Sequence, residues 1–92
     1  MPKTSIGRVA VATAGRGKGK RFVVVAEEGA EYLLLCDGRT RKLNKPKRKK
    51  RRHLQLEAHG VEPQLLRGDA ADANIRRELR ALTHQDSTLE EG

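Results

Sequence analysis

The sequence predicts a mainly β fold, a small barrel of about five strands, followed by a short α-helical C-terminal tail. Three observations lead to this prediction. Short runs of branched apolar residues alternate with glycine-containing turns in the first half of the chain. After Gly60 the apolar residues recur with helical spacing. The chain has 92 residues and only Phe22 and Tyr32 are aromatic, so aliphatic side chains must supply a small core.

The first three strands follow from local patterns. Gly7–Ala12 (GRVAVA) alternates in the way expected of a half-buried strand. The three glycines of Ala14–Lys20 (AGRGKGK), at 15, 17 and 19, permit positive φ angles and predict a sharply turned loop. Phe22–Ala26 is expected to form the second strand, Glu27–Ala30 a hairpin connection, and Glu31–Cys36 the third strand, which ends in a small core cysteine.

Two further strands are expected in the basic part of the chain. Asp37-Gly38 is a strong signal for a two-residue turn, after which Arg39–Leu43 is expected to pair back as the fourth strand. Pro46 interrupts the hydrogen-bond ladder because proline has no N–H to donate. The basic residues beyond it are expected to re-enter as a short fifth strand, anchored by Leu54 and Leu56.

The remainder of the chain predicts helical structure. Glu62–Arg67 is a helical turn with Pro63 in its first turn, and Asp72 is expected to cap a second helix. In that helix one apolar stripe is expected to dock on the barrel or on the preceding helical turn, and three arginines are expected to face away from it. The stripe contains Ile75, Leu79 and Leu82, and the arginines are Arg76, Arg77 and Arg80.

These elements divide the chain into two parts. Residues 1–56 are expected to form the barrel with its basic segment, and residues 57–92 a helical tail packed on the barrel. The end of the tail, from His84 onward, is polar and is expected to be frayed.

The charge is distributed unevenly along the chain. Residues 1–53 hold 16 Lys and Arg against 4 acids, a formal charge of +12, whereas residues 54–92 hold 4 against 8, a formal charge of −4. Ten of the fourteen residues of Arg39–Arg52 are basic; we call this segment the basic arm. A polyanion relieves the repulsion within such a segment and releases counterions, so this asymmetry favours an oriented phosphate-binding surface over a solvated basic tail or a nuclear-localisation patch.

The candidate phosphate contacts lie in two segments, the basic arm and the glycine loop Ala14–Lys20, which we call the basic loop. The loop contributes Gly15, Gly17 and Gly19 to its geometry. The candidate RNA contacts are Arg16, Lys18, Lys20, Arg21, Arg39, Arg41, Lys42, Lys45, Lys47, Arg48, Lys49, Lys50, Arg51 and Arg52.

Other chemistries have weaker support in the sequence. The basic loop leads into a strand and not into a helix, so neither a Rossmann fingerprint nor a P-loop has its required context. His53, His59, His84 and Cys36 have no metal-ligand spacing, and no Ser/His/Asp set or acid pair can be assembled. We therefore expect no cofactor, no metal and no enzymatic activity. No apolar stretch is long enough to span a membrane, so a cytoplasmic protein is expected.

Two strands around a glycine-bearing basic loop resemble the KOW motif. The resemblance rests on Val9-Ala10-Val11, Ala14–Lys20 and Phe22–Val25, and continues from Cys36 through Leu54. The chain is similar to small bacterial KOW-domain RNA-binding proteins, which are similar to a large-subunit ribosomal protein family of archaea and eukaryotes. The resemblance implies an SH3-like barrel and an RNA-binding role connected with ribosomes or translation.

Two functions remain open at this point. In the first, the basic loop and basic arm form two sides of one surface that binds the backbone of structured RNA, most plausibly ribosomal RNA. Phe22 and Tyr32 both lie in apolar strands, so stacking of single-stranded bases on exposed rings is not expected. In the second, the barrel and the C-terminal helix bind a transcription or translation protein, and the basic arm only tethers the module to nucleic acid.

Overall fold

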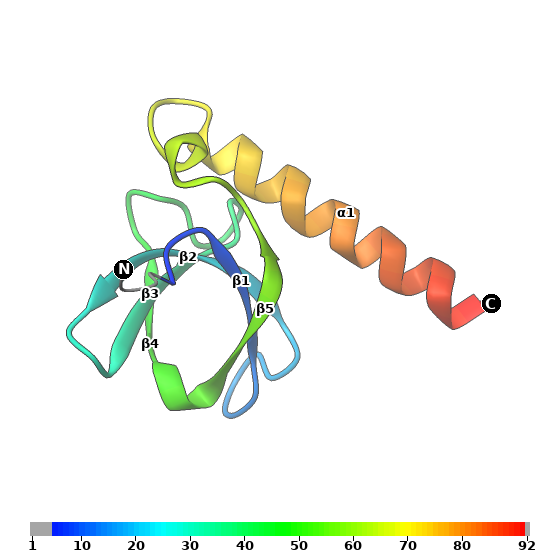
Figure 1. Cartoon of the computed structure of the whole chain (residues 1–92), viewed down its shortest axis with the longest axis horizontal. Helices are drawn as coiled ribbons and strands as arrows, with labels where there is room; N and C mark the ends of the chain where they lie inside the picture. The colour runs from blue at the N-terminus through cyan, green and yellow to red at the C-terminus, as the bar shows by residue number, and fades with distance from the viewer. Residues whose placement is uncertain (1–4, 92) are drawn as a thin grey trace.

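The fold is a curled five-stranded antiparallel sheet with one C-terminal helix (Figure 1). The computed structural model describes the backbone of residues 5–91 and the side chains of residues 5–82. The mainly β class predicted from the sequence is confirmed, and the sheet has the curled form of a small barrel-like fold. Its elements are β1 (Arg8–Ala12), β2 (Arg21–Glu28), β3 (Tyr32–Cys36), β4 (Lys47–Lys50), the 3₁₀ turn η1 (Arg51–His53), β5 (Leu54–Gly60), the 3₁₀ turn η2 (Pro63–Leu66) and α1 (Ala71–Glu91).

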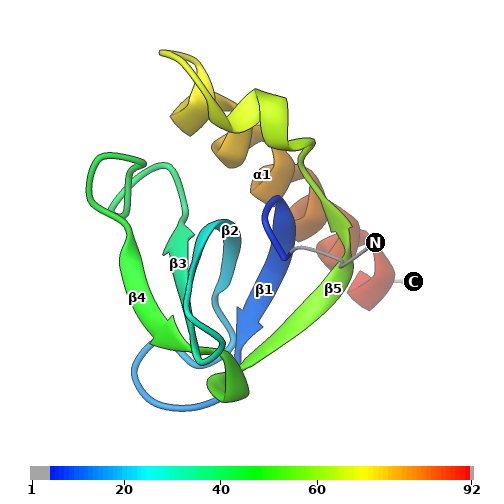
Figure 2. The ribbon, with the colours of Figure 1, turned by 60° about the vertical axis from the view of Figure 1, so that its left-hand side comes forward.

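The strand order is β4-β3-β2-β1-β5, so the two strands that follow each other last in the sequence lie at opposite edges of the sheet. Figure 2 shows how η1 joins the ends of β4 and β5 below the curled sheet. Register shifts in β2, between Val24 and Ala26, and in the β1–β5 pair, between Arg8 and Ala10, contribute to this curvature. The edges of the sheet are therefore brought toward each other at the η1 end.

Each face of the sheet has its own apolar cluster, as the alternation of strand side chains requires. One cluster lies on the inner side of the curled sheet and consists of Ala10, Ala12, Phe22, Val24, Leu33 and Leu35, with Leu54 and Leu56 packed against it. The other is covered by η2 and α1 and consists of Val9, Val23, Cys36, Val61, Leu66, Ile75 and Leu82, with Ile6, Val25, Leu43 and Leu79 packed against it. The predicted docking stripe of the helix is thus confirmed, and Cys36 is a fully buried core residue.

The prediction of a fourth strand at Arg39–Leu43 is wrong. This segment is part of a ten-residue loop between β3 and β4, and the predicted two-residue turn at Asp37-Gly38 is also wrong. The Asp37 carboxylate accepts the backbone N–H groups of Arg39 and Arg41, each at 2.8 Å, and a distant carboxylate, that of Asp72, accepts the N–H of Leu43. Because side chains take up these donors, the segment has no ladder to form.

The fourth and fifth strands lie later in the chain than predicted. The basic residues after Pro46 form β4 itself, paired with β3, and Leu54–Gly60 forms β5 beside β1. The boundary expected between residues 56 and 57 falls inside β5. The hairpin between β2 and β3 is also tighter than expected, because β2 continues to Glu28.

The C-terminal part differs from expectation in two details. Asp72 does not cap α1, because the helix already begins at Ala71 and the Asp72 carboxylate is bound to Leu43. Arg76 does not face away, because its guanidinium donates to the carbonyl oxygen of Gly38 at 2.6 Å.

Pro63 opens η2 as predicted, and the helix backbone continues to Glu91, through the segment expected to be frayed. Among the described residues, no helix is long and apolar enough to cross a membrane.

Candidate nucleic-acid interface

The basic loop forms a compact turn between β1 and β2. All three of its glycines have positive φ, 75° at Gly15, 81° at Gly17 and 92° at Gly19. The N–H of Gly19 donates to the carbonyl oxygen of Ala12 at 2.7 Å, and the N–H of Lys20 donates to that of Gly17 at 2.8 Å. The loop therefore has an internally bonded shape, and the exposed side chains of Arg16, Lys18 and Lys20 project from it.

Replacing Gly19 tests whether this shape matters. An added Cβ would meet no atom within 4 Å, so the cost of Gly19→Val arises from its φ of +92° and not from a clash. We expect the free energy of unfolding to fall by about 1–3 kcal/mol. Denaturant unfolding measures this loss. Thr13→Val is the matched control, since Thr13 is exposed, lies beside the same loop and has no positive φ. Equal stability of the two variants would contradict the prediction.

Lys49 connects the basic loop to the basic arm. It lies in β4, and its Nζ donates to the carbonyl oxygen of Ala14 at 3.0 Å. The two bonded residues, Ala14 and Lys49, are 35 positions apart in the sequence. This bond places the basic loop beside β4, as two adjoining parts of one end of the molecule.

Lys47 marks the point at which basic residues of several elements converge. Burial lowers the pKa of the Lys47 ammonium, and the positive charges of Lys49, Arg41 and Lys20 lower it further. Its Nζ lies 5.7 Å from the centroid of the Phe22 ring. These cations come from the basic loop, the β3–β4 loop and β4. We call Lys20, Arg41, Lys47 and Lys49 the basic cluster.

The β3–β4 loop is held in place by Asp37 at its start and by helix α1 at Gly38 and Leu43. Asp37 accepts two backbone N–H groups through Oδ1 and the Thr40 hydroxyl through Oδ2, at 2.8 Å in each case. Helix α1 secures the loop through Asp72 and Arg76. Gly38, with φ +78°, permits this close approach, because a Cβ there would lie 2.5 Å from the carbonyl oxygen of Asp72. The helix therefore orients the loop that carries Arg39, Arg41, Lys42 and Lys45.

The Asp37 contacts predict a dependence of stability on pH. Burial alone would raise the pKa of the Asp37 carboxyl, but hydrogen bonds from the N–H groups of Arg41 and Arg39 and from Thr40 outweigh it and hold the pKa below its ordinary value of 3.8. A lowered folded-state pKa contributes stability that is present above pH 3.8 and is lost as the pH falls through the folded-state value.

We expect Asp37→Asn to remove this contribution. The difference in free energy of unfolding between wild type and variant should be largest at neutral pH and should shrink as the pH falls below 3.8. Denaturant unfolding across that range measures the difference. A difference that stays constant with pH would show that the charge of Asp37 does not stabilise the loop.

Three of the fourteen candidate RNA contacts are held by carboxylates. Arg21 pairs with Glu57 at 3.3 Å, Arg48 pairs with Glu28, and Arg51 pairs with Glu27 at 3.3 Å. The sequence alone does not indicate these ion pairs, because each acid lies 20 to 36 residues from its arginine and no local pattern connects the two. Their charges are partly neutralised within the protein.

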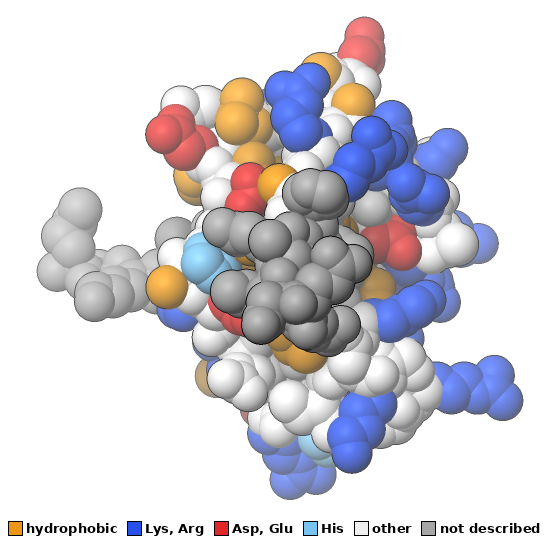
Figure 3. All heavy atoms as spheres, turned by 90° about the vertical axis from the view of Figure 1, so that its right-hand side faces the viewer, with side chains coloured by type: hydrophobic (Ala, Val, Ile, Leu, Met, Phe, Trp, Pro, Cys, Tyr) orange, Lys and Arg blue, Asp and Glu red, His pale blue; other side chains and the backbone are white. Residues whose placement is uncertain are grey.

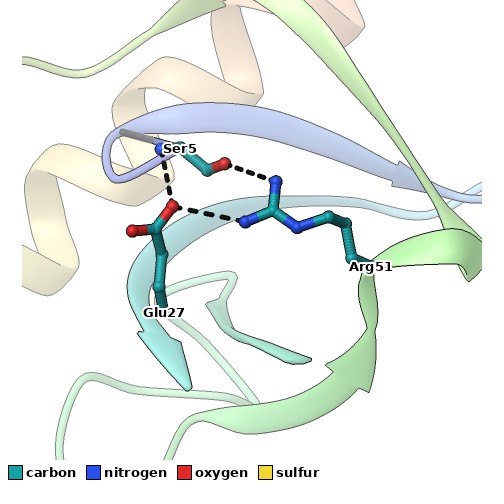
Figure 4. Close-up of polar contacts among 3 residues, drawn as sticks. All are labelled: Ser5, Glu27 and Arg51. Carbon is teal, nitrogen blue, oxygen red and sulfur yellow. Dashed lines mark hydrogen bonds and ion pairs between the residues drawn. The ribbon is translucent and has the colours of Figure 1, made fainter. Parts of the chain in front are cut away.

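Figure 4 shows the Arg51 network, which connects the start of the described chain to β2 and to the first residue of η1. The Arg51 guanidinium donates to Ser5 Oγ at 2.9 Å and to Glu27, and the Ser5 N–H donates to the same Glu27 oxygen at 3.0 Å. The hydrogen bond from the Ser5 N–H is the main cause that lowers the pKa of Glu27. Ser5 is buried, so this arrangement is part of the fold, and Arg51 has a structural role.

The other eleven candidate cations lie in the basic loop, the β3–β4 loop, β4 and η1. Figure 3 shows Lys and Arg side chains along one side and at the lower end, the end at which Figure 1 draws the β1–β2 loop. Within the part of the chain that is described, no carboxylate pairs with them. The exposed members are Arg16, Lys18, Lys20, Arg39, Lys42, Lys45 and Arg52, and the half-buried ones are Arg41, Lys47, Lys49 and Lys50.

Neither aromatic ring is open for stacking. Phe22 is 3% exposed and belongs to the inner core. Tyr32 is half-buried, and the guanidinium of Arg48 covers its ring, with Cζ 3.6 Å from the ring centroid. The candidate interface therefore offers cations and, among the described residues, no fully exposed aromatic ring.

No protein-family model matches the chain, and no curated protein is found to be similar to it. Among the described side chains, no group of three or more His, Cys, Asp or Glu is placed to hold a metal ion. A function for the chain therefore has to be proposed from the arrangement of its basic side chains.

Proposed function

We propose that the chain is a cytoplasmic RNA-binding protein that contacts the phosphate backbone of structured RNA, with ribosomal RNA as the principal partner. The observation that carries the proposal is the basic cluster, in which half-buried Lys47 is subject to the positive charges of Lys49, Arg41 and Lys20. Like charges held together in a folded protein repel each other, and a phosphate placed among them removes that repulsion. The cluster is thus arranged to gain from binding an anion.

The buried rings support backbone recognition over reading of single strands. Proteins that hold single strands stack successive bases on exposed aromatic side chains, and Phe22 is not exposed here. Cations on a rigid curved surface instead match the phosphates of a folded RNA. The choice of ribosomal RNA rests on the resemblance of the basic loop and its flanking strands to the KOW motif.

The alternative, a protein-directed module, is less well supported. It requires α1 to offer its apolar stripe to a partner, but Ile75 is 0% exposed and Leu82 is 7% exposed within the chain itself. The side chains that would anchor a partner are already part of the core. We therefore propose binding of RNA, without catalysis, as the function.

Crosslinking in cells, followed by sequencing of the bound RNA, tests the proposal. We expect the recovered RNA to be dominated by structured segments of ribosomal RNA, and the protein to sediment with ribosomes or ribosomal subunits. Recovery of a protein complex with no RNA enrichment over an uncrosslinked control would favour the protein-directed alternative instead.

A further inference from the structure

Arg48 and Tyr32 form a stacked pair on the outer face of the β3–β4 ladder. Arg48 Cζ lies 3.6 Å from the centroid of the Tyr32 ring, and Arg48 Nε donates to the carboxylate of Glu28. The three residues come from β4, β3 and β2 respectively. The contact with the Tyr32 ring sets the plane of the Arg48 guanidinium. The hydrogen bond to Glu28 sets its rotation within that plane.

This plane remains accessible from the solvent side. The Arg48 side chain is 54% exposed although Tyr32 covers one of its faces. A guanidinium is planar and only weakly hydrated, and RNA bases stack on arginine planes as they do on aromatic rings. Because Arg48 is already held by two partners, a base that stacks on it would immobilise little additional side-chain freedom.

Cations suited to the neighbouring phosphate lie at the same end of the ladder. Lys50 lies directly opposite Tyr32 in the β3–β4 register. A hollow of about 240 Å³ beside the β2–β3 turn is lined by Lys50, Arg51 and Arg52, and also by Ala30 and the acidic residue Glu31. Strand alternation places Arg48 and Lys50 on the face opposite Lys47 and Lys49, so this location is separate from the basic cluster.

We propose that Arg48, stacked on Tyr32, is a binding site for one unpaired nucleobase of the bound RNA, with Lys50 and Arg52 taking the adjacent phosphate. The inference rests on the proposed RNA-binding function and adds a substrate feature to it. The preferred RNA is a helix interrupted by a bulged nucleotide, so that the basic cluster contacts the backbone and Arg48 takes the extruded base.

Two RNA hairpins that differ only by a single bulged nucleotide test this site. The bulge carries 2-aminopurine, whose fluorescence falls when it stacks. We expect the chain to bind the bulged hairpin about tenfold more tightly than the unbulged one and to quench the label. Arg48→Lys keeps the charge but removes the plane, so it should bring the affinity ratio close to one and abolish the quenching.

A matched pair at Tyr32 separates the stacking role from general damage. Tyr32→Phe keeps the ring and should keep the affinity ratio, whereas Tyr32→Leu should lose it. Arg67 is an exposed arginine that belongs to neither the basic loop nor the basic arm. Arg67→Lys is therefore the charge-matched control and should also keep the affinity ratio. Tyr32 is the sole tyrosine and the chain has no tryptophan, so tyrosine emission reports the state of this pair in the free protein.

The outcomes distinguish this inference from the function on which it rests. Equal affinity of the wild type for both hairpins, or a ratio that Arg48→Lys leaves unchanged, would overturn the stacking site while RNA binding stands. Failure of the wild type to bind either hairpin at low salt would instead overturn the proposed function itself, and the stacking site with it.

Discussion

Replacing Lys20, Arg41 and Lys47 with glutamine is expected to flatten the salt dependence of RNA binding. Each phosphate contact contributes about 0.7–0.9 to the slope of log K against log salt, so the loss of three contacts should reduce the slope by about 2–3. Affinity at low salt should fall steeply for the same reason. Titration of a structured RNA at several salt concentrations measures both quantities.

The control removes the same amount of charge from elsewhere. Arg67, Arg77 and Arg80 are exposed and are not members of the basic cluster; Arg67 lies between η2 and α1, and the other two lie on α1. Their joint replacement by glutamine lowers the net charge by three, as the first variant does, but should leave most of the slope intact. Equal slopes for the two triple variants would mean that net charge, and not the basic cluster, governs binding.

The largest loss of stability is expected at Ile75. This side chain is 0% exposed and belongs to the core cluster that lies between α1 and the sheet. Ile75→Ala should lower the free energy of unfolding by about 2–5 kcal/mol, since it removes buried methyl groups and leaves a cavity. Denaturant unfolding, followed by circular dichroism, measures the change.

Leu65→Ala provides the comparison, because Leu65 is 45% exposed. Leu65→Ala removes as many carbon atoms as Ile75→Ala, but from a side chain that is only partly buried. We therefore expect a clearly smaller fall in the free energy of unfolding. If Leu65→Ala were as costly as Ile75→Ala, α1 would not be packed through the stripe that contains Ile75.

The helix also matters for the interface. Asp72 and Arg76 hold the β3–β4 loop, so packing of α1 through Ile75 fixes the position of Arg41 and its neighbours. Helix α1 is joined to the candidate interface by two hydrogen bonds, from Arg76 to the carbonyl oxygen of Gly38 and from the Leu43 N–H to Asp72.

The local pattern of the sequence was sufficient for the first three strands and for the docking stripe of the helix. In the first strands, alternate residues such as Val9 and Val23 are apolar, and a strand places alternate side chains on one buried face. Ile75, Leu79 and Leu82 share one face of a helix. The basic loop was likewise recognisable, because closely spaced glycines tolerate the positive φ angles that its turn requires.

Contacts between distant residues decided the rest. The turn signal at Asp37-Gly38 predicted that Arg39–Leu43 pairs back as a strand, but Asp37 and Asp72 accept the N–H groups that a strand would use. The ion pairs of Arg21, Arg48 and Arg51, and the stack of Arg48 on Tyr32, likewise join different elements. The sequence by itself determined which segments could be strands, helix and basic surface, since those depend on periodicity and composition. Only the tertiary structure decided which cations are paired, which converge on Lys47 and which are stacked, because these relations arise from chain segments that meet only after folding.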